Sequence, residues 1–128
     1  MDEKTKPVTV VIEFKFEKLV IWQKAMDYGE TITKIANTFP KEEIYNLSSQ
    51  IRRAVDSIAL NISEGAIEQS APEFKKFVGY AIRSLAEVVT CLHKAKRRNY
   101  ISIEEFMIQY EFAFNLMNMM ISFKQKIH

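Results

Sequence analysis

From Glu17 onward, apolar residues recur at intervals of three and four positions, the spacing of one face of an α-helix. The first such face spans residues 22–39, and Pro40 ends the helix because proline disfavours helical conformation in the residue before it. The apolar positions of this face are Trp22, Ala25, Met26, Gly29, Ile32, Ala36 and Phe39.

A second helical face follows a short polar connection. Ser48 or Ser49 is the expected N-cap, since a hydroxyl can accept a bond from a free backbone N–H group. Gly65 is expected just beyond the helix, where glycine accepts a positive φ. The buried positions predicted for this helix are Ile51, Val55, Ile58, Ala59 and Ile62.

Two further helices begin with capping signals. Ser70 with Glu73, and Ser102 with Glu105, have the spacing of a capping box, in which each residue bonds the backbone of the other. The third helix ends near residues 98–99, and the fourth runs toward the C-terminus. The core stripe predicted for the third helix is Phe74, Val78, Ala81, Ile82, Leu85, Val89 and Leu92.

Four amphipathic helices joined by short turns predict an all-α fold, an up-down-up-down antiparallel four-helix bundle over residues 17–128. Residues 1–16 are expected to form a short extended N-terminal arm. Residues 8–16 are β-branched and partly alternating, so they could form a strand. A single strand cannot satisfy its own backbone groups, so the arm either stays mobile or lies along another element.

The fourth helix carries more apolar surface than one core can cover. Between residues 106 and 123, 13 of 18 residues are apolar, and the polar ones other than Gln109 gather in one sector. A membrane helix would not keep Glu111, Asn115 and Asn118 in its middle. We therefore expect a homo-oligomer, with a well-buried core helix in a monomer as the alternative. The residues predicted at the oligomer interface are Met107, Met117, Met119 and Met120, because methionine adapts to irregular contacts.

Composition limits the size of the domain, the presence of disulfides and the cellular compartment. The chain has 128 residues, enough for one domain with its own core. Its single cysteine, Cys91, excludes an internal disulfide and favours a reducing compartment. The charged N-terminus leads into no uninterrupted apolar run, so no secretion signal is expected, and we expect the protein to be cytoplasmic.

Cys91 and His93 are two positions apart on a helix and do not face each other, which excludes a thiolate–imidazole pair between them. Glu42 and Glu43 are expected to be solvated in a turn.

Positive charge is concentrated in the third quarter of the chain. The net charge is only +2, but residues 66–100 carry seven lysines and arginines against three acidic residues. The candidate nucleic-acid-binding residues are Lys94, Lys96, Arg97 and Arg98. The alternative is that these cations only complement the dipole at a helix C-terminus. In a symmetric ring the cluster would repeat once per subunit and attract phosphate more strongly.

A line of polar residues follows the second helix beside its apolar line: Gln50, Arg53, Ser57, Asn61 and Glu64. A similar line on the third helix, opposite its core stripe, contains Ser84, Glu87 and Cys91. A solvated edge is the ordinary interpretation. The alternative is a packing seam in which Arg53 and Glu87 each find an opposite charge or several carbonyls, while Asn61 and Glu64 bond the backbone near Gly65.

These segments resemble a known family. The motif S-Q-I-R-R-A, then S-I-x-x-N-I-x-E-G, at residues 49–65, and S-L-x-E at residues 84–87, are similar to the bacterial four helix bundle proteins encoded in intervening sequences of 23S ribosomal RNA genes. The family is related to accessory variability determinants of diversity-generating retroelements. The resemblance implies a ring, typically a homopentamer, with no enzyme activity. The sequence itself has no Gly-rich phosphate loop and no metal-ligand spacing, so no cofactor or metal is expected. It also implies RNA or DNA as a partner, or a protein such as a reverse transcriptase.

Together these observations predict a non-enzymatic, oligomeric protein associated with nucleic acid. The alternative is a protein–protein scaffold without nucleic-acid contact. Salt dependence separates the two, because phosphate contacts weaken steeply as salt rises and an apolar interface does not.

Overall fold

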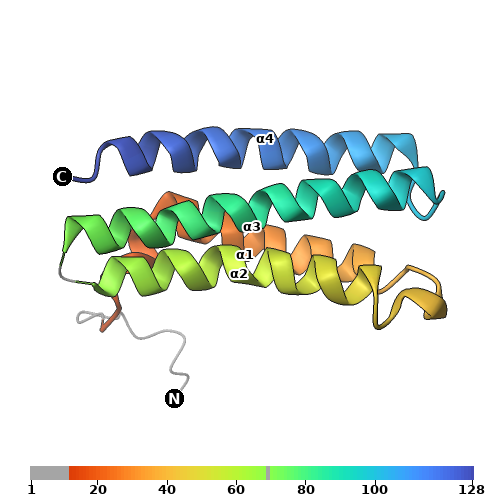
Figure 1. Ribbon diagram of the computed structural model, residues 1–128, viewed down its shortest axis with the longest axis horizontal. Coiled ribbons are helices and arrows are strands. Elements are labelled where there is room, and N and C mark those ends of the chain that lie inside the picture. Colours follow the sequence, from red (N-terminus) through yellow and green to blue (C-terminus); the bar gives the residue numbers. More distant parts are fainter. Residues whose placement is uncertain (1–11, 69) are drawn as a thin grey trace, which may run out of the picture.

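The computed structural model describes residues 12–68 and 70–128. Four helices run side by side, each antiparallel to the next (Figure 1), and the part of the chain described contains no strand. The predicted all-α four-helix bundle is therefore confirmed. The helices are α1 (Val20–Ala36), α2 (Leu47–Ile67), α3 (Ala71–Arg97) and α4 (Ile103–Gln125), with two 3₁₀ turns, η2 (Lys15–Lys18) and η3 (Lys41–Glu43).

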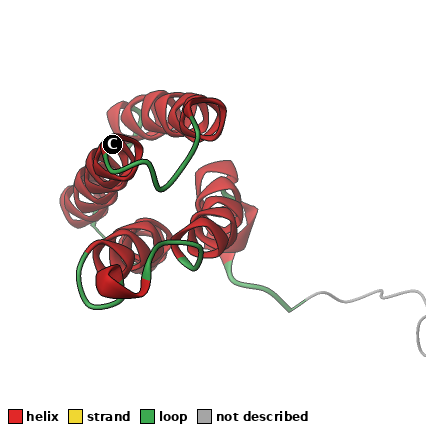
Figure 2. Cartoon of the chain, turned by 90° about the vertical axis from the view of Figure 1, so that its right-hand side faces the viewer, coloured by secondary structure: helices red, strands yellow, loops and turns green. Residues whose placement is uncertain are grey.

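The core lies between the four helices, which surround it in the end-on view (Figure 2). All five residues predicted to be buried on α2 are buried. On α1, Met26 corrects the prediction, because its side chain is 44% exposed at the edge of the helix face. The largest fully buried side chains are Tyr28, Ile32, Leu47, Ile51, Val55, Ile58, Ile62, Val78, Leu85, Leu92, Leu116 and Met120.

The closest helix pair is α2 with α3, and Gly65 shows why. Gly65 is not the residue that follows α2, since the helix continues to Ile67 and no glycine of the chain has a positive φ. A Cβ on Gly65 would lie 2.8 Å from Cβ of Phe77 and 2.9 Å from Cδ1 of Phe74. Glycine is needed here because α3 approaches the α2 backbone too closely for a side chain.

Each predicted capping box forms by half, with the bond to the serine hydroxyl and without the return bond from the serine N to the glutamate carboxylate, and the cap predicted at Ser48 or Ser49 does not form. Oγ of Ser70 accepts a bond from N of Glu73, and Oγ of Ser102 accepts one from N of Glu105. The α2 helix begins earlier than expected, after Asn46 rather than at Ser48 or Ser49. The first of its free N–H groups is satisfied from outside the helix, because the Glu43 carboxylate accepts from the backbone N of Leu47.

The expectation that Glu43 is solvated is wrong. Glu43 is buried, and its Oε2 accepts from Nη1 of Arg98 at 2.9 Å and from the hydroxyl of Tyr100 at 2.6 Å. Its Oε1 accepts from Nδ2 of Asn46. The hydrogen bond from Tyr100, followed by the bonds from Leu47 and the charge of Arg98, lowers the pKa of Glu43 despite its burial.

Most of the predicted N-terminal arm, residues 1–11, lies outside the described residues. The arm is not extended as far as residue 16, because η2 begins at Lys15. Phe14 stacks on Phe16, and Phe16 packs edge-on against Trp22 with 5.4 Å between ring centroids. These aromatic contacts hold the start of the described chain against α1.

The α4 helix packs mainly along α3 and touches α1 at fewer positions. Its contact with α1 centres on Tyr28, whose hydroxyl donates to the backbone O of Gln109 at 2.9 Å and whose ring stacks on Phe112. One broad side of α4 is thus left uncovered. None of the helices in the described ranges is apolar over a length that would span a bilayer.

Candidate nucleic-acid interface

The structure divides the predicted basic cluster into two pairs. Lys94 and Arg97 are exposed on the outer side of α3. Nζ of Lys96 lies 4.0 Å from the centroid of the Phe106 ring, and Arg98 forms the ion pair with Glu43. The last two cations therefore stabilise the junction of α3 with its neighbours, and only the first two are presented to solvent without such a contact.

A hollow of about 460 Å³ between α2 and α3 gathers further cations. Arg53 from α2, and Arg83 and Lys94 from α3, line it together with the carboxylate of Glu87. Three positive charges around one negative charge leave a local excess that suits an anion. Sequence reasoning missed Arg83. The available signal was spacing, since positions 83 and 94 are eleven residues apart and so lie three turns apart on one helix face.

The polar line of α2 was predicted to be a buried or half-buried seam in the assembled protein, which a single chain does not test. Arg53, Glu64 and Glu87 are exposed in the single chain, while Gln50 and Asn61 are half-buried. Gln50, Arg53 and Glu87 all border the hollow, but no ion pair joins Arg53 to Glu87 among residues 12–68 and 70–128.

Much of this line is satisfied within its own helix. Nδ2 of Asn61 donates to the backbone O of Ser57, and Oγ of Ser57 donates to the backbone O of Arg53, both at 2.8 Å. Asn61 was expected to bond the backbone near Gly65, and it bonds the backbone of Ser57 instead. The corresponding line on α3 is also not opposite the core, because Ser84 and Cys91 are buried and Cys91 lines the hollow between α2 and α3.

The four methionines predicted at the oligomer interface differ in exposure. Met107 is 58% exposed, and Met117 and Met119 are half-buried. Met120 corrects the prediction, because it is completely buried in the core of its own chain. Most of the exposed apolar residues of α4, together with the half-buried Met117, form a ridge with the 4-3-4-3-4 spacing of a coiled-coil seam. We call this the α4 ridge; its residues are Ile103, Met107, Tyr110, Phe114, Met117 and Ile121.

The Cys91 thiol and the His93 ring, the candidate reactive groups, do not form a common site in the described residues. Burial raises the pKa of the Cys91 thiol, which keeps it protonated and unreactive at neutral pH. His93 is exposed, and its ring packs edge-on against Phe106 and Tyr110. In the part of the chain that the structure describes, no three His, Cys, Asp or Glu side chains are grouped to hold a metal ion.

The sequence of the chain matches a known protein family. The sequence model of the 23S rRNA-intervening sequence protein family matches residues 17–122. The chain belongs to this family. That match covers the whole of α1, α2 and α3 and nearly all of α4, and it confirms the resemblance drawn from the motifs at residues 49–65 and 84–87.

A solved structure shares the fold of this family member. It is a protein of unknown function from the S23 ribosomal protein family of Bacteroides thetaiotaomicron, with a TM-score of 0.78 and 23% sequence identity. The similarity covers 88% of this chain and 100% of that one. No functionally curated protein matches the chain.

Proposed function

We propose that this member of the 23S rRNA-intervening sequence protein family is a cytoplasmic, non-enzymatic homo-oligomer that associates with RNA. The observation that carries the proposal is the hollow between α2 and α3, where Arg53, Arg83 and Lys94 surround one carboxylate. Arg97 lies on the same side of α3, one turn beyond Lys94. Such exposed cations bind phosphate groups with little dependence on base sequence.

Oligomerisation follows from the α4 ridge. Met107 and Phe114 are 58% and 57% exposed, which is a large area of apolar surface for a monomer to leave in water. A 4-3-4-3-4 seam is buried efficiently by another helix with the same seam. A ring with five subunits is the assembly that the family resemblance favours. In any ring the cationic hollow repeats once per subunit, which strengthens its attraction for a polyanion.

Absence of catalysis is part of the proposal. The thiol of Cys91 is buried and protonated, and the carboxylate of Glu43 is occupied by four hydrogen bonds that stabilise the fold. A catalytic nucleophile needs an activating base within hydrogen-bond reach, and Cys91 has no such partner in the described ranges.

The test is the native mass of the purified protein before and after nuclease treatment. We expect a mass of several subunits that falls on nuclease treatment by the mass of bound RNA while the subunit number stays the same. A nuclease-insensitive mass combined with no RNA affinity at low salt would contradict the association with RNA. A single-subunit mass at micromolar concentration would contradict the oligomer.

A second candidate function is a protein scaffold, and the α4 ridge is the observation that favours it. A partner such as a reverse transcriptase could supply the helix that covers the ridge. Binding through apolar contacts would change little between low and high salt, whereas binding to RNA through the hollow would weaken steeply.

A further inference from the structure

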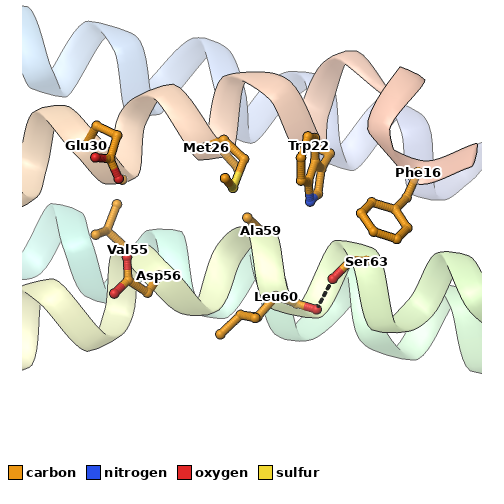
Figure 3. A pocket seen from close by; sticks show the side chains of 11 residues that line it. Phe16, Trp22, Met26, Glu30, Val55, Asp56, Ala59, Leu60 and Ser63 are labelled. Atoms are coloured by element: carbon orange, nitrogen blue, oxygen red, sulfur yellow. Dashed lines mark hydrogen bonds between the residues drawn. The ribbon is translucent and has the colours of Figure 1, made fainter. Parts of the chain in front are cut away.

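The groove between α1 and α2 has the opposite charge to the cationic hollow between α2 and α3. It is about 440 Å³ in volume, and Figure 3 shows Glu30 from α1 and Asp56 from α2 at one end of it. Neither carboxylate forms an ion pair with another residue of the described ranges. This side of the bundle therefore repels phosphate, and a polyanion bound at the hollow is directed away from it.

A pocket of about 330 Å³ lies between α3 and α4, at the end of the bundle where α3 begins and α4 ends (Figure 1). It is lined by Lys75 from α3, by Lys124 and Gln125 from α4, and by the apolar side chains of Ile82 and Ile121. Both lysines are half-buried, and neither forms an ion pair within residues 12–68 and 70–128. Charges of one sign beside apolar walls concentrate the electric field, so the pocket attracts an anion.

Among the described residues, no carboxylate lines this pocket. Glu73 lies two positions before Lys75, but its Oε1 is paired with Nζ of Lys76 at 2.9 Å, and Lys76 does not line the pocket. The side-chain amide of Gln125 has two N–H groups that can donate to a phosphate oxygen. The pocket therefore combines two positive charges and a neutral donor, which is a suitable set for one phosphate group.

Gly79 shows that this pocket is in line with the exposed cations at the other end of α3. Nζ of Lys124 lies 3.4 Å from the position that a Cβ on Gly79 would take, so the tip of the lysine lies over α3 at this point. Arg83 follows one turn later. Arg97 is 18 residues from Gly79, which is five full turns of helix, or about 27 Å. Lys124, Arg83 and Arg97 therefore follow one outer side of α3.

We propose that Lys75, Lys124 and Gln125 form a second phosphate-binding site, and that one strand of RNA lies along the outer side of α3 from this pocket to the cationic hollow. This inference rests on the proposed association with RNA and adds the path that the strand takes. At about 3.4 Å per nucleotide of a stacked strand, the path corresponds to about 8 nucleotides. Because its contacts are to phosphate, binding should depend little on base sequence.

The experiment measures binding of the full chain to a fluorescein-labelled single-stranded RNA of mixed sequence, about 16 nucleotides long, at several salt concentrations. K75S/K124S should lower the affinity about tenfold at about 50 mM salt and make the slope of log affinity against log salt shallower by about 0.7, as for one lost phosphate contact. K75R/K124R keeps both charges and should retain the wild-type affinity. The matched control is K15S/K18S, which removes the same charge from two exposed lysines of η2 and should change neither quantity.

The outcomes separate the second site from the association with RNA. Binding by the wild type with equal affinities and slopes for K75S/K124S and K15S/K18S would overturn the second site and leave the hollow as the RNA site. No binding by the wild type at low salt would contradict the proposed function, and the second site with it.

The same variants must keep their fold and their assembly. K75S/K124S should have the helix content of the wild type by circular dichroism and the same subunit number by analytical ultracentrifugation. This control is needed because Ile121, which lines the pocket, also belongs to the α4 ridge. A lower subunit number for K75S/K124S would assign the two lysines to a contact between subunits and would also overturn the proposal.

Discussion

The hydroxyl of Tyr100 donates a 2.6 Å hydrogen bond to the carboxylate of Glu43, although the two residues are 57 positions apart. Glu43 belongs to the connection between α1 and α2, and Tyr100 to the connection between α3 and α4. The bond therefore ties both connections together at one end of the bundle. Arg98 adds its charge to the same carboxylate oxygen, so this end is fixed by a buried, fully bonded group.

The first prediction concerns this carboxylate and pH. Because the pKa of Glu43 is lowered from 4.5 in the folded state, its ionised form stabilises the protein above that pH. This stabilisation is lost as the pH falls from 4.5 through the lowered pKa that Glu43 has in the folded protein. E43Q should reduce the Tm at pH 7 and flatten the dependence of Tm on pH below 4.5. The control E42Q changes an exposed neighbour and should leave both unchanged; equal behaviour of the two variants would contradict the assignment.

The second prediction compares two glycines. G65A should destabilise the fold by about 1–3 kcal/mol, because the new Cβ would overlap Phe77 and Phe74 on α3. G79A is the matched control, since its Cβ would meet only the flexible end of Lys124, at 3.4 Å. There the gain in helix propensity should stabilise by about 0.5–1 kcal/mol. Urea unfolding measures both, and a stable G65A would show that α3 can move away from α2.

Residues 17–128 illustrate what sequence predicts well and what it does not. Periodicity located all four helices, because burial of one face is a property of spacing along one element. The role of Glu43 could not be predicted, because it depends on Arg98 and Tyr100, which reach it from a distant connection. Met120 resembled the other methionines of α4 in sequence, but the angle at which the helix packs decided that it faces the core. Gly65 was assigned from local turn rules, whereas a neighbouring helix determines its role.

The third prediction tests the α4 ridge. M107K and F114K place charges in the seam and should each raise the dissociation constant of the oligomer by roughly tenfold or more. The matched control is I108K, because Ile108 is 62% exposed but lies off the ridge. Analytical ultracentrifugation gives the subunit number, and circular dichroism should show unchanged helix content. An oligomer that survives M107K and F114K would place the interface elsewhere.

The fourth prediction tests the cationic hollow. K94S/R97S should weaken RNA binding on all sequences alike, because phosphate contacts carry no base information. The slope of log affinity against log salt should become shallower by about 0.7 for each phosphate of single-stranded RNA that the variant no longer neutralises. K34S/K41S removes the same charge from α1 and η3, at residues that do not line the hollow, and is the control. Equal affinities and slopes for both variants would exclude Lys94 and Arg97 from the interface.

The fifth prediction concerns Arg53 and Glu87. Both are exposed in the single chain, so R53A should change the free energy of unfolding of a subunit by only about 0.5 kcal/mol. If a neighbouring subunit packs on Arg53 and Glu87 at the edge of the hollow and leaves Lys94 open to RNA, each of the two residues must be paired across the interface, and R53A should weaken assembly on the order of 3 kcal/mol. A double-mutant cycle of R53A and E87A on the dissociation constant separates direct pairing from independent effects. Additive effects would mean that the two residues do not meet.

The α4 ridge shares no residue with the fully buried core of the bundle. Substitutions at its most exposed positions, such as Met107 and Phe114, should therefore change the stability of the subunit little. Two copies of such a gene in one genome could diverge in ridge sequence alone and stop mixing their subunits, while both keep the same fold. If the ridge is the subunit interface, the residues that fold the bundle are largely distinct from those that decide which chains it recognises.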